Sequence, residues 1–218
     1  MDIRKYWDRK IIEWEDSVRK GYNVSFIERL ASYFRKPLFY RTEMCLDILG
    51  PHVRDRDVLE LGSGSGYFAF RLFERARPHS ITCVDFSQEA IERGRKLGIE
   101  KYGAENILKF MVADITKMDM PSAYVTIGLG LLDYLNEAEI SELFMEINSE
   151  YFLFTFPERV FSLLRILHFF YMKTQQCPKH YYYKKSDIKE CCDGRFSGLK
   201  FINEPRLSFG CIVHNLPD

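Results

Sequence analysis

The glycine-rich segment Val58–Gly66 is the part of this sequence most indicative of chemistry. An apolar run with the length of a strand leads into three alternate glycines, and the run contains one acidic residue, Glu60. The loop consists of Gly62, Ser63, Gly64, Ser65 and Gly66. Glycines at the carboxyl end of a strand permit a sharp turn and let a ligand approach the main chain. We therefore expect a binding loop here rather than a plain surface turn.

Two acidic residues end the next two apolar runs along the chain. Asp85 lies about 20 residues beyond the glycines, where an acidic side chain can accept from both ribose hydroxyls. The alternative role is a helix cap, but Ser87 suits that role better. Asp114 ends the third run, where the alternative is a solvated loop position. Together with the glycine loop, these positions form a joint pattern that is more specific than any one of them.

Strand-like runs alternate with helical patterns over the middle of the chain. We expect strands at 57–61, 80–84, 107–113, 124–128 and 151–156, and helices at 67–77, 87–97 and 137–149. Such alternation predicts parallel crossover units. Two further strands, 199–203 and 207–214, lie close enough in sequence to form an antiparallel pair. The predicted fold class is α/β: a Rossmann-like, doubly wound, seven-stranded and mostly parallel sheet with a C-terminal antiparallel hairpin.

Three helices are expected before the first strand, at 3–19, 25–34 and 39–49, with Ser25 as an N-cap and Gly50-Pro51 as the terminator. We interpret the chain as a single domain in four parts. These are an N-terminal helical cap (1–50), a cofactor-binding core (51–156), a cap insertion (157–186) and the C-terminal hairpin (187–218).

In its glycine loop, its acidic positions and its order of elements, the sequence resembles the class I S-adenosylmethionine (SAM)-dependent methyltransferase family. The resemblance is close over about residues 40–156 and extends to the C-terminal third by layout only. It implies SAM as the cofactor. The cofactor-binding residues that it implies are Glu60, Gly62, Ser63, Gly64, Gly66, Asp85, Phe86, Asp114, Ile115, Gly128 and Leu129.

The resemblance also assigns roles to these residues. Glu60 suits the amine of SAM, and Asp85 holds the ribose while Phe86 packs on the adenine. Asp114 accepts from the adenine amino group, and Ile115 covers the ring. In the family, the chain after the fourth strand passes beneath the methyl donor, and Gly128 would let the backbone come close there.

The segment after the fourth strand departs from some members of the family. Tyr124 replaces the usual acidic residue at the start of this strand, a position that is more structural than catalytic. The segment also lacks an Asn-Pro-Pro-Tyr or Asp-Pro-Pro-Tyr run, which belongs to methyltransferases that act on bases or glutamine. The resemblance therefore favours an oxygen acceptor over a nitrogen acceptor.

An oxygen acceptor usually needs a base. The candidates for the catalytic residues are His180, His168 and Tyr134, with Asp133 as a weaker alternative for the base. Each histidine is otherwise a surface or core residue. In the N-terminal region, the candidates to meet the cofactor carboxylate are Tyr22, Tyr40 and Arg41, which packing would explain equally well.

The insertion carries a largely apolar helical stretch at 159–173, with a narrow stripe of Arg159, Ser162, Arg165 and His168. Such a helix could be a lid over the substrate, a dimer contact or a helix on a membrane surface. At about fifteen residues it is too short to span a bilayer. We favour the lid, and a lid of this kind suggests a small, partly apolar acceptor.

Composition narrows the remaining possibilities. The 31 Lys and Arg residues balance the 31 Asp and Glu residues, which argues against a nucleic-acid partner. The six cysteines form no C-x-x-C pair and the five histidines show no metal spacing, so we expect no metal. The N-terminus lacks an apolar leader, and we expect a cytoplasmic monomer or homodimer.

Three alternatives to a small-molecule methyltransferase remain open from the sequence. The first is a protein or RNA methyltransferase, which the neutral charge disfavours. The second is a non-catalytic protein of this fold that acts as a binding or scaffold subunit. The third is a dinucleotide oxidoreductase, which the spacing G-x-G-x-G disfavours because dinucleotide-binding folds use G-x-G-x-x-G.

Overall fold

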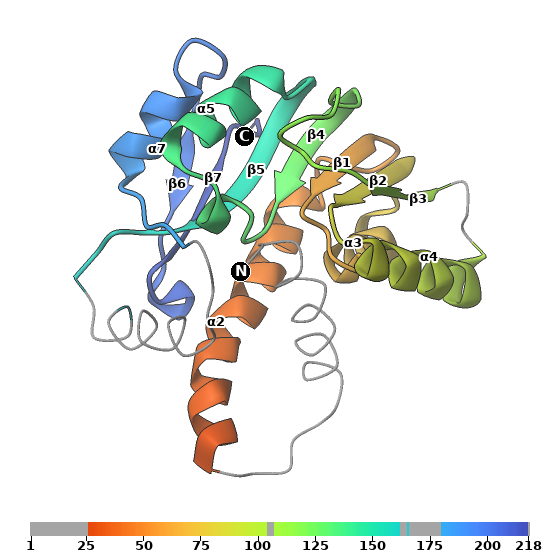
Figure 1. Ribbon diagram of the computed structural model, residues 1–218, viewed down its shortest axis with the longest axis horizontal. Helices are drawn as coiled ribbons and strands as arrows, with labels where there is room; N and C mark the ends of the chain where they lie inside the picture. The colour runs from red at the N-terminus through yellow and green to blue at the C-terminus, as the bar shows by residue number, and fades with distance from the viewer. Residues whose placement is uncertain (1–25, 104–106, 162–164, 166–179, 218) are drawn as a thin grey trace.

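A computed structural model describes residues 26–103, 107–161, 165 and 180–217, with side chains from residue 36 onward. In this part of the chain, seven strands form one sheet in the order β3-β2-β1-β4-β5-β7-β6 (Figure 1). Their bounds are β1 Asp57–Leu61, β2 Ser80–Asp85, β3 Leu108–Val112, β4 Ala123–Gly128, β5 Ser149–Pro157, β6 Lys200–Ile202 and β7 Gly210–His214. β1 to β5 pair in parallel, and β7 is antiparallel to both β5 and β6. The predicted fold class is confirmed.

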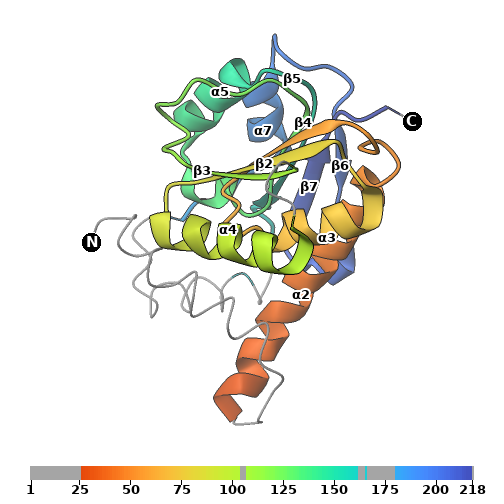
Figure 2. The same ribbon diagram turned by 90° about the vertical axis from the view of Figure 1, so that its right-hand side faces the viewer.

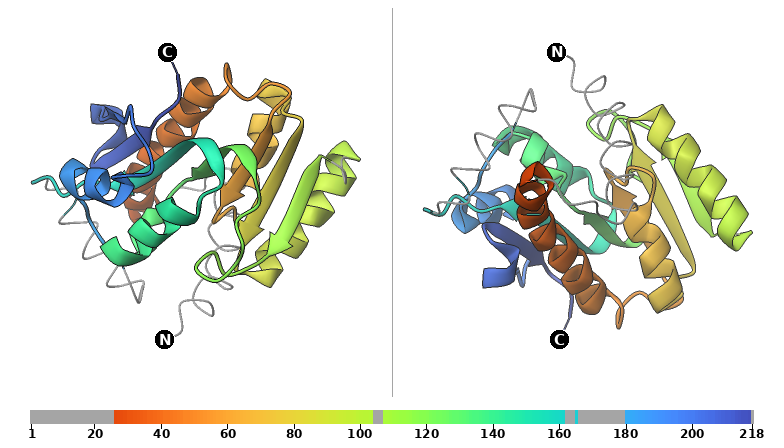
Figure 3. Two further views of the ribbon diagram at one scale, coloured as in Figure 1. Left: turned by 90° about the horizontal axis from the view of Figure 1, so that it is seen from above. Right: turned by 90° about the horizontal axis from the view of Figure 1, so that it is seen from below.

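Helices cover both faces of the sheet, as the edge-on view of Figure 2 shows. One face packs against α2 (Phe26–Leu49), α3 (Tyr67–Ala76) and α4 (Gln88–Tyr102), and the other against α5 (Glu137–Glu146) and α7 (Lys185–Cys192). Side chains alternate along β1, so that Val58 joins the first core and Leu59 the second. Seen from below in Figure 3, α2 lies beside α3, where Arg71 pairs with Glu43.

Local signals begin these helices where the sequence predicts them. Ser87 caps α4 by accepting from the Ala90 amide at 3.3 Å. Asn136 and Glu139 form a capping box at the start of α5. Because both caps sit at the carboxyl side of a strand, they also set where each crossover leaves the sheet.

The N-terminal prediction of two helices at 25–34 and 39–49 is wrong. The structure has one continuous helix, α2, with Pro37 inside it. A proline removes one backbone donor, but burial of Cys45, Leu46 and Leu49 in the core holds the C-terminal part of the helix regardless. The helix ends at Leu49, before Gly50, as predicted. The expected helix at 3–19 lies outside the described residues.

Other boundaries also differ from the prediction, and one helix was not predicted. Helix α4 continues to Tyr102 rather than ending at Leu97. Helix α5 stops at Glu146 rather than at Ser149, because buried Ile147 turns extended and Ser149 already belongs to β5. The last strand begins at Gly210 rather than at Leu207, which closes a short 3₁₀ turn after Pro205. Helix α7 was not predicted, although buried Ile188, Cys191 and Cys192 show its i, i+3, i+4 spacing. Along the chain, α7 lies between β5 and the hairpin of β6 and β7.

No helix in the described ranges is long and apolar enough to cross a membrane. Of the segment 159–173, only residues 159–161 and 165 are described, and Phe161 there is 93% exposed. The choice among lid, dimer contact and membrane-surface helix stays a prediction.

Candidate active site

The glycine loop turns where β1 meets β2. The parallel register aligns Leu61 with Val84, so the two strands end together. Gly62, Gly64 and Gly66 all adopt positive φ angles, of 67°, 56° and 78°. Residues that have a side chain rarely adopt a positive φ angle, which explains the glycine at each position.

Asp85 fixes the loop from the end of β2. Its side chain is buried, and its two carboxylate oxygens accept from the amides of Gly64 and Ser87, each at 2.9 Å. Each oxygen has a second lone pair, so the group keeps capacity to accept from a ligand. The predicted ribose residue therefore also holds the loop, a second role that the sequence did not indicate.

Glu60 belongs to β1. Its buried carboxyl group lies beneath the same loop, beside the first turn of α3. Burial raises its pKa to about 8, nearby Asp85 adds to the rise, and a hydrogen bond from the Ala69 amide opposes it. Burial and nearby Asp85 therefore favour the protonated form of Glu60 near neutral pH.

The end of β4 forms the opposite wall of the loop. A Cβ atom at Gly128 would lie 2.5 Å from the Phe154 ring, so only glycine fits there. The Gly130 amide donates to the Thr155 hydroxyl at 2.8 Å, and Gly130 has a φ of 73°. The sequence did not single out Thr155, because a threonine within a strand carries no distinguishing signal.

Arg41 reaches this wall from α2. A Cβ atom at Gly130 would lie 3.3 Å from both terminal nitrogens of Arg41, so the guanidinium lies directly against the glycine turn. Within the described residues, Arg41 Nε and Asp133 Oδ1 are buried without a hydrogen-bond partner. Burial raises the pKa of Asp133 to about 6, and the positive charge of Arg41 partly offsets the rise. The pair forms a polar corner with spare hydrogen-bonding capacity.

His180 and Tyr134 come together beside this corner. The Tyr181 amide donates to the Asp133 carbonyl at 2.8 Å, which brings the segment from His180 onward against the turn after β4. The His180 ring lies 6.2 Å from the Tyr134 ring and 4.7 Å from the Tyr182 ring, centroid to centroid. Burial lowers the pKa of His180 to about 4, so its imidazole is neutral at physiological pH. His168, the third catalytic candidate, lies outside the described residues.

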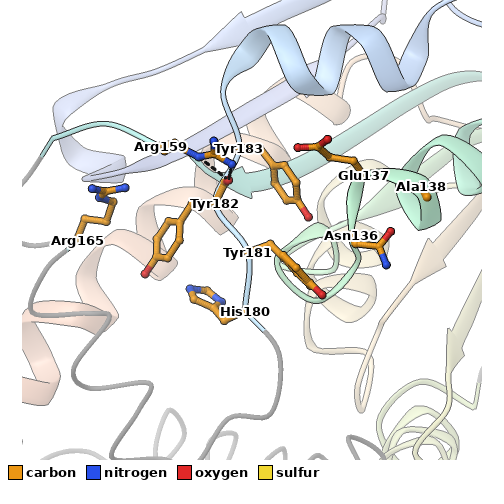
Figure 4. A pocket seen from close by; sticks show the side chains of 9 residues that line it. All are labelled: Asn136, Glu137, Ala138, Arg159, Arg165, His180, Tyr181, Tyr182 and Tyr183. Atoms are coloured by element: carbon orange, nitrogen blue, oxygen red, sulfur yellow. Dashed lines mark hydrogen bonds between the residues drawn. The ribbon is translucent and has the colours of Figure 1, made fainter.

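An open cavity of about 480 Å³ extends from His180 (Figure 4). Its lining residues are Asn136, Glu137, Ala138, Arg159, Arg165, His180, Tyr181, Tyr182 and Tyr183. None of the expected cofactor-binding residues lines it, and of the described catalytic candidates only His180 does.

The adenine-side candidates lie at the end of β3. Asp114 Oδ1 accepts from the Thr116 hydroxyl at 2.8 Å and from the Thr116 amide at 3.2 Å, while Lys117 pairs with the other oxygen. The Ala113 amide donates to the Asp85 carbonyl at 3.0 Å, so the ends of β2 and β3 are tied together. Of the remaining predicted positions, Phe86 follows β2, Ile115 lies after β3 and Leu129 follows β4, and all three are partly buried. The described residues contain no cluster suited to a metal ion.

Residues 58–149 match the family model described as a methyltransferase domain. The matched segment is less than half of the chain, and it is similar to a methyltransferase domain. The match covers the glycine loop, the acidic positions and β4. No curated protein sequence matches this chain significantly.

Solved structures share the fold of this chain. Magnesium protoporphyrin IX methyltransferase from Synechocystis PCC 6803, with bound S-adenosylhomocysteine (SAH), aligns with a TM-score of 0.74 at 16% identity, over 97% of this chain and 96% of that chain. The same enzyme with bound SAM aligns with a TM-score of 0.71 at 14% identity, over 98% and 96%. The methyltransferase SibL, in its apo form, aligns with a TM-score of 0.65 at 17% identity, over 97% and 72%.

Proposed function

We propose that this protein is a methyltransferase that moves a methyl group from SAM to an oxygen, in preference to a nitrogen, of a small acceptor. The observation that carries the proposal is the Asp85 carboxylate, buried at the strand ends and bonded to the Gly64 amide. The carboxylate can accept hydrogen bonds from hydroxyl groups, and it lies beside a turn whose glycines have positive φ angles. A ribose bound there would meet both features.

The side chains around the loop suit each part of SAM. Asp85 would hold the ribose, and Asp114, Phe86 and Ile115 would surround the adenine. Glu60 would lie toward the amine, and Arg41, buried with an unpartnered Nε, would pair with the carboxylate. Gly128 and Leu129 would pass beneath the methyl group.

When bound, SAM supplies a methyl carbon whose bond to sulfur breaks, with the electron pair left on sulfur, as the acceptor oxygen bonds to that carbon. His180 takes the proton that the acceptor oxygen loses. Burial lowers the pKa of His180 to about 4, which leaves the imidazole unprotonated at neutral pH and makes it a weak base. Its role therefore depends on its position beside the acceptor, and Tyr134, whose ring lies 6.2 Å from the His180 ring, would orient the acceptor.

Calorimetric titration with two ligands tests this proposal. SAH carries both the adenosine and the amino-acid halves, whereas 5′-methylthioadenosine lacks the amino acid. We expect Asp85→Asn to weaken both ligands at least tenfold, or about 1.4 kcal/mol. Arg41→Gln should weaken only SAH, because the nucleoside has no carboxylate for it to bind.

Matched substitutions of exposed residues, Asp119→Asn and Arg54→Gln, serve as controls and should leave both affinities unchanged. Thermal melts of each variant establish that it is folded. Absence of SAH binding to the folded wild type would refute the proposal. Equal weakening of both ligands by Arg41→Gln would refute the carboxylate role alone.

A further inference from the structure

Two guanidinium groups line one wall of the cavity beyond His180. Arg159 donates from Nε and from one terminal nitrogen to the Tyr182 carbonyl, at 3.1 and 2.9 Å, which fixes its position. The Arg165 guanidinium lies 5.5 Å from the centroid of the Tyr182 ring. Figure 4 shows Arg165 and His180 on either side of Tyr182. The wall is therefore held in place by backbone and ring contacts.

Aromatic rings supply a second part of the cavity lining. His180 meets Tyr182 edge to face, with an interplanar angle of 79°. Tyr181 and Tyr183 are stacked at 6.3 Å. Such surfaces favour a flat ring over a flexible chain, because aromatic pairs prefer offset or edge-to-face packing.

Positive charges outnumber negative charges among the residues that line the cavity. The cavity has two arginines and one acidic residue, Glu137, which stands in the first turn of α5. Burial raises the pKa of Tyr182 to about 12, against the opposing effect of Arg165, so this phenol is uncharged. A positive wall that faces a polar, partly enclosed space favours an anionic group on the ligand.

The span of that ligand has an upper limit. The Arg165 guanidinium carbon lies 5.5 Å and the His180 ring 4.7 Å from the centroid of the Tyr182 ring, so the two groups are at most about 10 Å apart, with Tyr182 between them (Figure 4). A ligand that reaches both groups must lie along the Tyr182 ring, and one ring or two fused rings are long enough for this.

We infer that the acceptor is a hydroxylated aromatic acid, whose carboxylate binds Arg165 and Arg159 and whose hydroxyl faces His180. This inference rests on the proposed function. The phenolic O–H bond breaks, its proton goes to the imidazole, and the new bond joins oxygen to the methyl carbon of SAM. The sequence predicts a partly apolar acceptor, and the inference adds a negatively charged carboxylate to it.

Binding of a matched pair of probes tests this inference. 6-Hydroxy-2-naphthoate, whose carboxylate and hydroxyl lie at opposite ends of the fused rings, and its uncharged amide have nearly the same shape and are both fluorescent. In the presence of saturating SAH, we expect the acid to bind the wild type at least tenfold more tightly than the amide. Arg165→Gln should remove most of this preference and Arg159→Gln part of it, while exposed Arg54→Gln should keep it.

Equal affinity of acid and amide for the wild type would overturn the inference, as would an unchanged preference in both arginine variants. The titration is repeated without SAH, and SAH binding is measured separately. If SAH binds but the preference is absent, only the acceptor assignment fails. If SAH does not bind, the proposed function fails.

Discussion

At the scale of single residues, the site depends on two adjacent buried carboxyl groups, Glu60 and Asp85. Asp85 accepts two backbone amides, and the pKa of Glu60 is raised because the group is buried and lies near Asp85. Removing a carboxyl group from water costs free energy unless it is hydrogen-bonded or neutral. Burial beneath the loop therefore favours the protonated form of Glu60.

Substitution of Glu60 by Gln tests this assignment through stability. The pKa of Glu60 is about 8 in the folded protein against an ordinary value of 4.5, so the folded state retains a proton that the unfolded state releases. Wild-type stability from this group is present below pH 4.5 and is lost as pH rises toward 8. We expect the midpoint of thermal unfolding of Glu60→Gln to exceed that of the wild type by an amount that grows from pH 5 to pH 8.

Exposed Glu146→Gln provides the control, with a difference from wild type that does not change over this range. A constant difference for Glu60→Gln as well would show that Glu60 is ionised in the folded protein.

At the scale of elements, α4 presses on the glycine loop. A Cβ atom at Gly94 would lie 2.5 Å from the Phe110 ring and 2.7 Å from the Ser65 carbonyl oxygen. The helix backbone therefore touches the loop and β3 directly. At Gly98, one turn along the same helix, a Cβ atom would make only ordinary contacts of 3.4 Å or more.

These two glycines make a matched pair of substitutions. We expect Gly94→Ala to lower the free energy of unfolding by about 1–3 kcal/mol, because α4 must move off the sheet. Gly98→Ala should be neutral or stabilising by up to about 1 kcal/mol, since alanine is the better helix former. Urea denaturation measures both, and SAH titration should show weaker binding only for Gly94→Ala. Equal destabilisation by the two substitutions would contradict the close packing of α4 on the loop.

At the scale of the whole molecule, one sheet supports two hydrophobic cores. Ile81 belongs to the core under α2 and α3, and Ile140 of α5 belongs to the core on the other face. Because every central strand contributes side chains to both cores, neither face can lose its packing without exposing the other. We therefore expect the described fold to unfold as a single cooperative unit.

Ile81→Val and Ile140→Val test this cooperativity with the same chemical change on each face. Each should lower the free energy of unfolding by about 0.5–1.5 kcal/mol. Far-UV circular dichroism and intrinsic fluorescence should report one coincident transition for both variants. If the two probes separate in either variant, the two faces unfold independently.

The sequence by itself determined the succession of parallel strands along the chain. It also determined the glycine loop and the acidic residues at the ends of β2 and β3. These features depend on local periodicity and on glycine positions, which neighbouring residues specify without the rest of the fold. The cap at Ser87 and the capping box at Asn136 belong to the same class.

Only the tertiary structure decided which distant residues meet. It placed Arg41 against Gly130, His180 beside Tyr134, and a cavity with two arginines beyond them. It also carried α2 through Pro37, where burial outweighs a lost backbone hydrogen bond. No sequence period records such contacts, because they arise when packing of the two cores brings separate segments to the same edge of the sheet.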